Sequence, residues 1–194
     1  MRILNAVLEK LERIVSDLMP PHGTHGLEHT MRVYRTCLAL GESLGADMSI
    51  LLPAVLLHDI VRDGEDHALA SSIRAGDILR GLDYSEKSIE EISKTIGAHS
   101  FSAGRMPESL EAKILSDADK LDAMGALGVY RAAMYSAENE RPLGDYVAHF
   151  SEKLLTLKDI IFTDEARRLS ESRHRFLLAY LKQVEDELNP GSAV

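Results

Sequence analysis

Apolar residues recur along most of the chain at intervals of three and four positions, the spacing that places them on one face of an α-helix. The alternation typical of a half-buried strand is nearly absent. The predicted helices cover residues 2–18, 27–44, 50–61, 67–80, 85–99, 110–136, 145–160 and 164–188. No repeat or low-complexity linker divides them, so the pattern predicts an all-α, single-domain helical bundle.

Two features interrupt this helical pattern. Pro53 lies inside the apolar segment 50–61, so we expect that helix to begin near Leu52 or to be kinked. The segment 100–109 contains Gly104 and Pro107 and is expected to be a flexible loop.

The composition and net charge of the chain argue against several classes of protein. The chain has 194 residues, of which 45% are hydrophobic, and 31 acidic against 22 basic residues give it a net charge of −9. This charge argues against binding duplex nucleic acid. No apolar stretch approaches the roughly 20 residues of a membrane span. Acidic residues interrupt the N-terminal helix, which argues against a signal peptide, and the single Cys37 suits a reducing compartment, so we expect a cytoplasmic protein.

The pair His58-Asp59 ends the apolar segment 50–61. A buried ionised carboxylate costs several kcal/mol unless a partner compensates it. A cation between the two side chains would satisfy both. The alternative is that the pair lies at a solvated helix end.

A second acidic group precedes another apolar stretch. Asp119 and Asp122 are three residues apart and share a helix face, and the uncharged segment 123–130 follows them. The alternative is that Asp117 and Asp122 are solvated and that Lys120 neutralises one of them.

Several histidines are further candidates for a metal or substrate site. His25 and His29 are four residues apart and share a face at the start of a predicted helix. His67 begins a helix and His99 ends one. Structural roles are expected for His149 and His174.

The order His29, His58-Asp59, Asp119 resembles the signature of the HD-domain metal-dependent phosphohydrolases. The local sequences at 25–33, 56–60 and 118–123 resemble the motifs of that family. The segment 149–157 resembles a helix of one uncharacterised bacterial and archaeal branch, so the resemblance covers nearly the whole chain.

The resemblance implies that His29, His58, Asp59 and Asp119 bind a divalent metal ion. His67 and His99 would bind a second metal ion or contact a substrate phosphate. Mn or Fe is favoured, with Co, Ni, Zn and Mg as alternatives. The expected architecture is one HD-type domain over 1–194, with a catalytic core at about 20–136 and C-terminal helices 145–188 packing on it.

The implied reaction is cleavage of a phosphate ester or phosphoanhydride of a small phosphorylated metabolite, with a nucleotide favoured, by a metal-activated water. The general base remains open among residues 28, 63, 65 and 66, and an assembly of several copies is also left open. The candidates for substrate contact or catalysis are His25, Arg32, Asp63, Lys120, Asp122 and Lys153.

Two other functions fit the same residues. One is a di-iron oxygenase, because the same fold performs oxygenase chemistry with six ligands from these motifs. The other is a regulatory module that binds metal and nucleotide without turnover.

Overall fold

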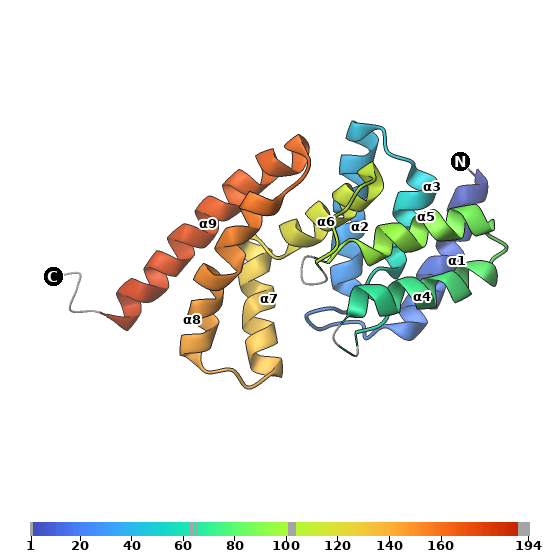
Figure 1. The fold of residues 1–194 in the computed structure, drawn as a ribbon. Helices are drawn as coiled ribbons and strands as arrows, with labels where there is room; N and C mark the ends of the chain where they lie inside the picture. Colours follow the sequence, from blue (N-terminus) through green and yellow to red (C-terminus); the bar gives the residue numbers. More distant parts are fainter. Residues whose placement is uncertain (1, 63, 65, 101–103, 190–194) are drawn as a thin grey trace. The chain divides into compact units, whose positions relative to one another are not determined.

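The structure, a computed structural model, describes residues 2–62, 64, 66–100 and 104–189. Contacts divide the chain into two compact units, Met1–Asp119 and Lys120–Val194. Within the described ranges every regular element is a helix, which confirms the predicted all-α class (Figure 1). The single domain predicted over 1–194 stays a prediction.

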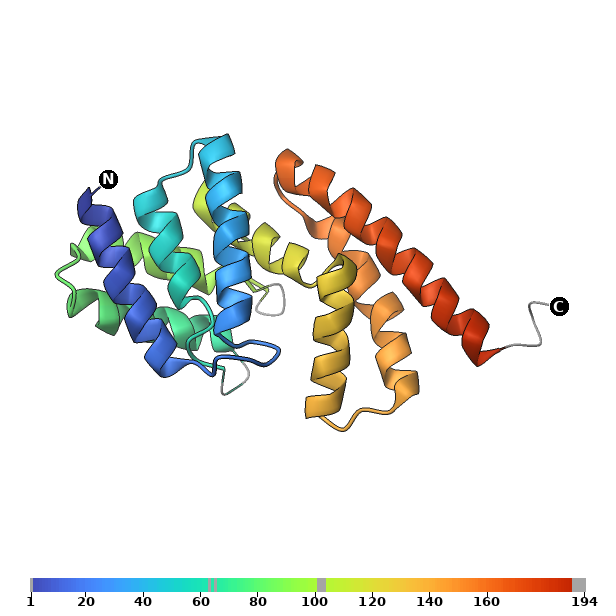
Figure 2. The ribbon, with the colours of Figure 1, turned by 180° about the vertical axis from the view of Figure 1, so that it is seen from behind.

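The first unit is built around one apolar helix. It contains α1 (Arg2–Leu18), α2 (Leu27–Leu44), α3 (Met48–Leu57), α4 (His67–Arg80), α5 (Glu86–Gly97) and most of α6 (Leu110–Asp122). Helix α3 contacts α1, α2, α4 and α5, and residues 50–57 are all buried (Figures 1 and 2). A helix that is apolar on all sides is stable only when neighbours surround it, and this packing brings the residues that follow α3 into the interior of the unit.

Side-chain caps fix several helix starts. Asp66 accepts a hydrogen bond from the backbone N–H of Leu69 at 3.1 Å, and Ser85 accepts one from Ser88 at 3.1 Å. Such caps satisfy N–H groups that have no partner within the helix. The observed bounds of α1, α2 and α4 agree with the predicted ones.

The prediction for α3 was wrong at both ends. Asp47 caps the helix by accepting from Ser49 N at 2.9 Å, so the helix begins at Met48 and Pro53 lies inside it. It ends at Leu57, before residue 61. His58 and Asp59 therefore follow the helix, where their side chains can turn towards other segments.

Two long predicted helices are each divided. The segment 110–136 forms α6 and α7 (Gly125–Glu138), because Gly125 takes a φ of +69°, a left-handed conformation that ends a regular helix. The segment 145–160 forms α8 (Leu143–Glu152) and the 3₁₀ helix η2 (Leu154–Ile160), separated at Lys153.

The second unit packs α7, α8, η2 and α9 (Asp164–Leu188) together. Its interior contains Phe150, whose ring stacks on Tyr180, and a hydrogen bond of 2.9 Å joins the Tyr146 and Tyr180 hydroxyls. Among the described residues, no helix combines the length and apolar character needed to cross a membrane.

Candidate metal centre

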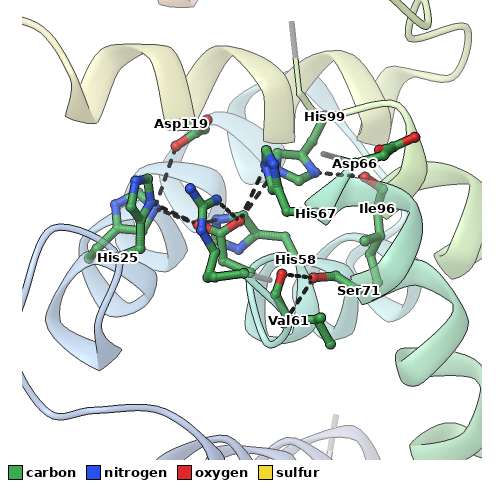
Figure 3. Close-up of polar contacts among 12 residues, drawn as sticks. His25, His58, Val61, Asp66, His67, Ser71, Ile96, His99 and Asp119 are labelled. Atoms are coloured by element: carbon green, nitrogen blue, oxygen red, sulfur yellow. Dashed lines mark hydrogen bonds and ion pairs between the residues drawn. The ribbon is translucent and has the colours of Figure 1, made fainter. Parts of the chain in front are cut away.

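Five separate segments of the first unit bring histidines and aspartates to one point. His25 precedes α2, and His29 lies in its first turn; His58 and Asp59 follow α3. His67 is the first residue of α4, His99 follows α5, and Asp119 lies in α6. Figure 3 shows the labelled members of this cluster pointing towards one another.

The imidazole rings form a continuous row. The ring centroids are separated by 5.6 Å between His25 and His29, 5.4 Å between His29 and His58, and 5.0 Å between His58 and His99. His67 follows at 5.5 Å from His99. A close turn before α2 places the first two rings, because Gly26 lies so near the backbone of residues 20 and 22 that no larger residue fits there.

Asp59 lies at the middle of this row, and its two carboxylate oxygens face different neighbours. Oδ2 is 3.1 Å from His25 Nδ1, 3.7 Å from His29 Nε2 and 3.8 Å from His58 Nε2. Oδ1 is 3.7 Å from the Nε2 atoms of both His67 and His99. Asp119 belongs to the group on the Oδ2 side of Asp59. Its own Oδ1 atom is 3.4 Å from His29 Nε2, the atom that faces Asp59 Oδ2.

Backbone carbonyls fix the proton on two of the imidazoles. His58 Nδ1 donates to the carbonyl of Val55, and His99 Nδ1 donates to that of Ile96, both at 2.7 Å. A carbonyl oxygen only accepts, so in the neutral ring Nε2 carries the lone pair. His58 Nε2 is buried and has no hydrogen-bond partner among the described residues. A buried nitrogen in this state is costly unless a ligand uses its lone pair.

Burial sets the charge of these groups. It lowers the pKa of His58 to about 4, so this imidazole is neutral at physiological pH and able to bind a metal ion. Burial, followed by the charge of Arg62, likewise lowers the pKa of His67 to about 4. Burial alone would raise the pKa of Asp59, but the surrounding imidazoles, led by His58, and the Arg62 guanidinium hold it well below its ordinary value.

The donor set fits a divalent cation. Ligand atoms of His29, His58 and Asp119 lie within 4.8 Å of one another, as do those of His58, Asp59 and His99, and those of His25, His29 and Asp59. Imidazole nitrogens and carboxylate oxygens without a thiolate suit Mn, Fe, Co, Ni and Zn. The two carboxylates would balance the charge of such an ion, and His58 Nε2 would gain the partner that the described protein atoms do not give it.

The cluster has a buried floor and a more accessible rim. Floor side chains are 0–2% exposed and belong to His29, His58, Asp59 and His99. Rim side chains are 20–35% exposed and belong to His25, Arg62, His67 and Asp119. A small molecule would therefore reach the floor by way of the rim.

Three residues around the cluster were missed by sequence reasoning. Arg62 Nη1 donates to Asp59 Oδ1 at 2.8 Å, and its position three residues after Asp59 was a usable signal. Ser71 Oγ accepts from Val61 N and donates to Val61 O, both at 3.1 Å.

Arg105, the third, joins the segments that carry His67 and His99. It donates to both carboxylate oxygens of Asp66, at 2.7 and 2.8 Å, and to Gly97 O at 2.7 Å. Its pairing partner Asp66 caps the helix that begins at His67, and Gly97 lies two residues before His99.

The other candidate residues belong to α2, to the second unit or to positions outside the described residues. Arg32 is half-buried on α2, one turn after His29. Three candidates are in the second unit: Lys120 Nζ lies 4.8 Å from the centre of the Phe162 ring, Asp122 accepts from Arg131 at 3.0 Å, and Lys153 is exposed beyond α8. Asp63 and Glu65 lie outside the described residues, as do residues 101–103 of the predicted loop.

The two described candidates for the general base both have partners. Glu28 lies 3.0 Å from His22 Nδ1 on the surface, and Asp66 is engaged by Arg105. Neither of these two contacts joins the floor of the cluster, so they give no support to either residue as the general base.

Comparisons with known proteins identify the family of this chain. The model of the HD domain matches residues 26–124, more than half of the chain, and this range contains His29, His58, Asp59 and Asp119. The uncharacterised protein YpgQ of Bacillus subtilis is 34% identical over 93% of this chain and 91% of its own length.

Solved structures show the same fold. Bacillus subtilis YpgQ in complex with ADP superposes with a TM-score of 0.82 at 30% identity, covering 95% of this chain and 96% of that one. An HD-superfamily hydrolase from Bacillus thuringiensis gives 0.73 at 28% identity, covering 96% and 98%. The family match, the fold and the convergence of the motif residues lead to one conclusion: the chain belongs to the HD-domain family.

Proposed function

We propose that this protein is a metal-dependent phosphohydrolase that cleaves a phosphate ester or phosphoanhydride of a small phosphorylated metabolite, a nucleotide in the favoured case. The observation that carries the proposal is the buried His58 Nε2, which faces Asp59 at 3.8 Å and has no hydrogen-bond partner among the described residues. Metal coordination is the chemistry that best explains a neutral imidazole in this position.

The metal ligands in this proposal are His29, His58, Asp59 and Asp119. A divalent cation bound there would polarise a phosphoryl oxygen and lower the pKa of a bound water towards neutrality. The protein positions these ligands in advance. The carbonyl of Val55 holds the His58 ring through Nδ1, and His25 donates to Asp59 Oδ2 if its Nδ1 carries the proton.

The rim supplies groups suited to an anionic substrate. His25 and His67 each present an imidazole to the accessible side of the cluster. Arg32 lies three residues after His29 on the same helix, so its guanidinium projects from a neighbouring part of that helix face. We assign phosphate binding to these groups within the first unit.

The nucleotide as substrate is supported by the relative. YpgQ was solved in complex with ADP, and its structure matches nearly the whole of this chain. A site with two carboxylates and one divalent cation is close to neutral, and it can therefore accept a polyphosphate without strong repulsion.

The test is a screen of nucleotides and simple phosphate esters, with Mn, Fe, Co, Ni, Zn and Mg supplied separately to protein stripped of metal. We expect phosphate or pyrophosphate release that depends on the metal and is lost in His58→Ala and Asp59→Asn. His174→Ala serves as the control, because His174 lies in α9, in the second unit.

Other outcomes would point to the other functions. Full hydrolysis by the stripped protein would refute the proposal. An oxygen-sensitive iron centre with no hydrolysis would indicate an oxygenase, and tight nucleotide binding without turnover would indicate a regulatory module.

A further inference from the structure

Arg62 holds a distinctive position in the cluster. Its guanidinium donates to Asp59 Oδ1 at 2.8 Å, and that same oxygen lies 3.7 Å from His67 Nε2 and 3.7 Å from His99 Nε2. The atoms nearest to one another on this side of Asp59 are thus a carboxylate oxygen and two imidazole nitrogens, which are of the kinds that bind divalent metal ions. The guanidinium is a cation that lies at the edge of this group.

The two sides of the Asp59 carboxylate therefore differ in charge. On the Oδ2 side, His29 connects the group to a second carboxylate, that of Asp119, at 3.4 Å. On the Oδ1 side, the group contains the Arg62 guanidinium, which cannot lose its proton in a protein. The Oδ2 side favours a divalent cation, whereas the Oδ1 side already carries a positive charge.

We propose that Arg62 takes the place of a second metal ion on the Oδ1 side of Asp59, so that the native centre holds one ion. This proposal rests on the metal site described under Proposed function. It implies that His67 and His99 do not bind a second metal ion. These two imidazoles are then available to contact the substrate.

The contact can act in this way for two reasons. The hydrogen bond uses a lone pair of Oδ1 that a bridging carboxylate would give to a second ion. The like charge of the guanidinium also repels a divalent cation placed among the same ligands. Arg62 is the more exposed partner and Asp59 the buried one, so removing the guanidinium opens the Oδ1 side to ions from solvent.

The experiment measures bound metal. Wild-type protein and variants are stripped with a chelator, incubated with excess Mn²⁺, desalted and analysed by mass spectrometry of the metal. We expect about one ion per chain in wild type and in Arg62→Lys, and about two in Arg62→Ala and Arg62→Gln. Arg80→Ala is the matched control, because Arg80 also pairs with an aspartate three residues earlier, Asp77, and it should leave the content at about one.

Two further measurements show where the added ion binds. In Arg62→Ala the two Mn²⁺ ions would share the Asp59 carboxylate, so their electron paramagnetic resonance spectrum should show a spin-coupled pair. The double variant with Arg62→Ala and His67→Ala should lose the second ion. Circular dichroism of Arg62→Ala and Arg62→Gln shows whether each variant is folded. A change of metal content is thereby distinguished from a failure to fold.

The outcomes are distinct. Two ions in wild type, or one ion in both Arg62→Ala and Arg62→Gln, would overturn the role of Arg62 while leaving a metal-dependent hydrolase in place. A second ion without spin coupling would overturn it as well. If wild type binds no Mn²⁺, the metal site of the proposed function fails together with this inference.

Discussion

Asp59→Asn separates two roles of the Asp59 carboxylate. One is its contribution to the stability of the metal-free fold, and the other is metal binding. The substitution keeps the shape of the side chain and removes its charge. Without metal, it weakens the hydrogen bonds at 2.8 Å to Arg62 and 3.1 Å to His25, each worth about 1.5–3 kcal/mol when charged. It also removes the desolvation penalty of a buried carboxylate, which is several kcal/mol. These effects oppose each other, so we expect the stability of the metal-free protein to change by about 2 kcal/mol or less.

With metal the two proteins should differ clearly. A ligand at a concentration about 100 times its Kd stabilises the folded state by about 2.7 kcal/mol. For a chain of this size, that corresponds to a rise of roughly 5–11 °C in Tm. Because Asp59 faces His29 and His58 through Oδ2, its loss should abolish the rise.

The assay is thermal unfolding followed by circular dichroism, with and without Mn²⁺. Asp77→Asn is the control, because Asp77 also pairs with an arginine three residues later, Arg80, and is not part of the cluster. The control should show the wild-type rise. An undiminished rise in Asp59→Asn would show that the Asp59 carboxylate does not bind the metal ion. Unfolding of this variant at room temperature in the absence of metal would show that the metal-free fold depends on that charge.

Three further predictions concern the surroundings of the site. Ser71→Ala leaves the N–H and carbonyl groups of Val61 without their partner and should lower the free energy of unfolding by about 1–3 kcal/mol in urea titrations; a change below about 0.5 kcal/mol would contradict this. Arg105→Ala should change stability by no more than about 1 kcal/mol, because its ion pair with Asp66 is partly exposed. It should nevertheless reduce kcat/KM roughly 10-fold or more by loosening the segments that carry His67 and His99, and wild-type kinetics would exclude this role. His174→Ala should keep turnover within a few-fold of wild type, and a complete loss would mean that the site extends into the second unit.

Much of the fold follows from local patterns in the sequence. Helix α2 begins at Leu27 and ends at Leu44 as predicted, since Gly45 adopts a left-handed φ of +71° directly after it. Helices such as α3 and α7 were harder to delimit. Asp47 caps α3, and burial of residues 50–57 stabilises the helix although Pro53 lies inside it; only the structure shows that Gly125 adopts a positive φ.

The candidate site was predictable in its residue types but not in its arrangement. A charged pair at the end of an apolar helix indicated His58 and Asp59 because burial of such groups requires a partner. The two carboxylate oxygens of Asp59 face different sets of imidazoles because of the way four helices pack. Such packing cannot be read from a local sequence pattern. Arg105 contacts Asp66 across 39 residues, so sequence spacing gave no signal for it.

The most direct test of a metal centre is a crystal structure of the protein grown with Mn²⁺, with data collected to record the anomalous scattering of the metal. We expect one strong anomalous peak at coordinating distance from His29, His58, Asp59 and Asp119, on the Oδ2 side of Asp59. A peak remote from these side chains, or none at saturating Mn²⁺, would contradict this expectation.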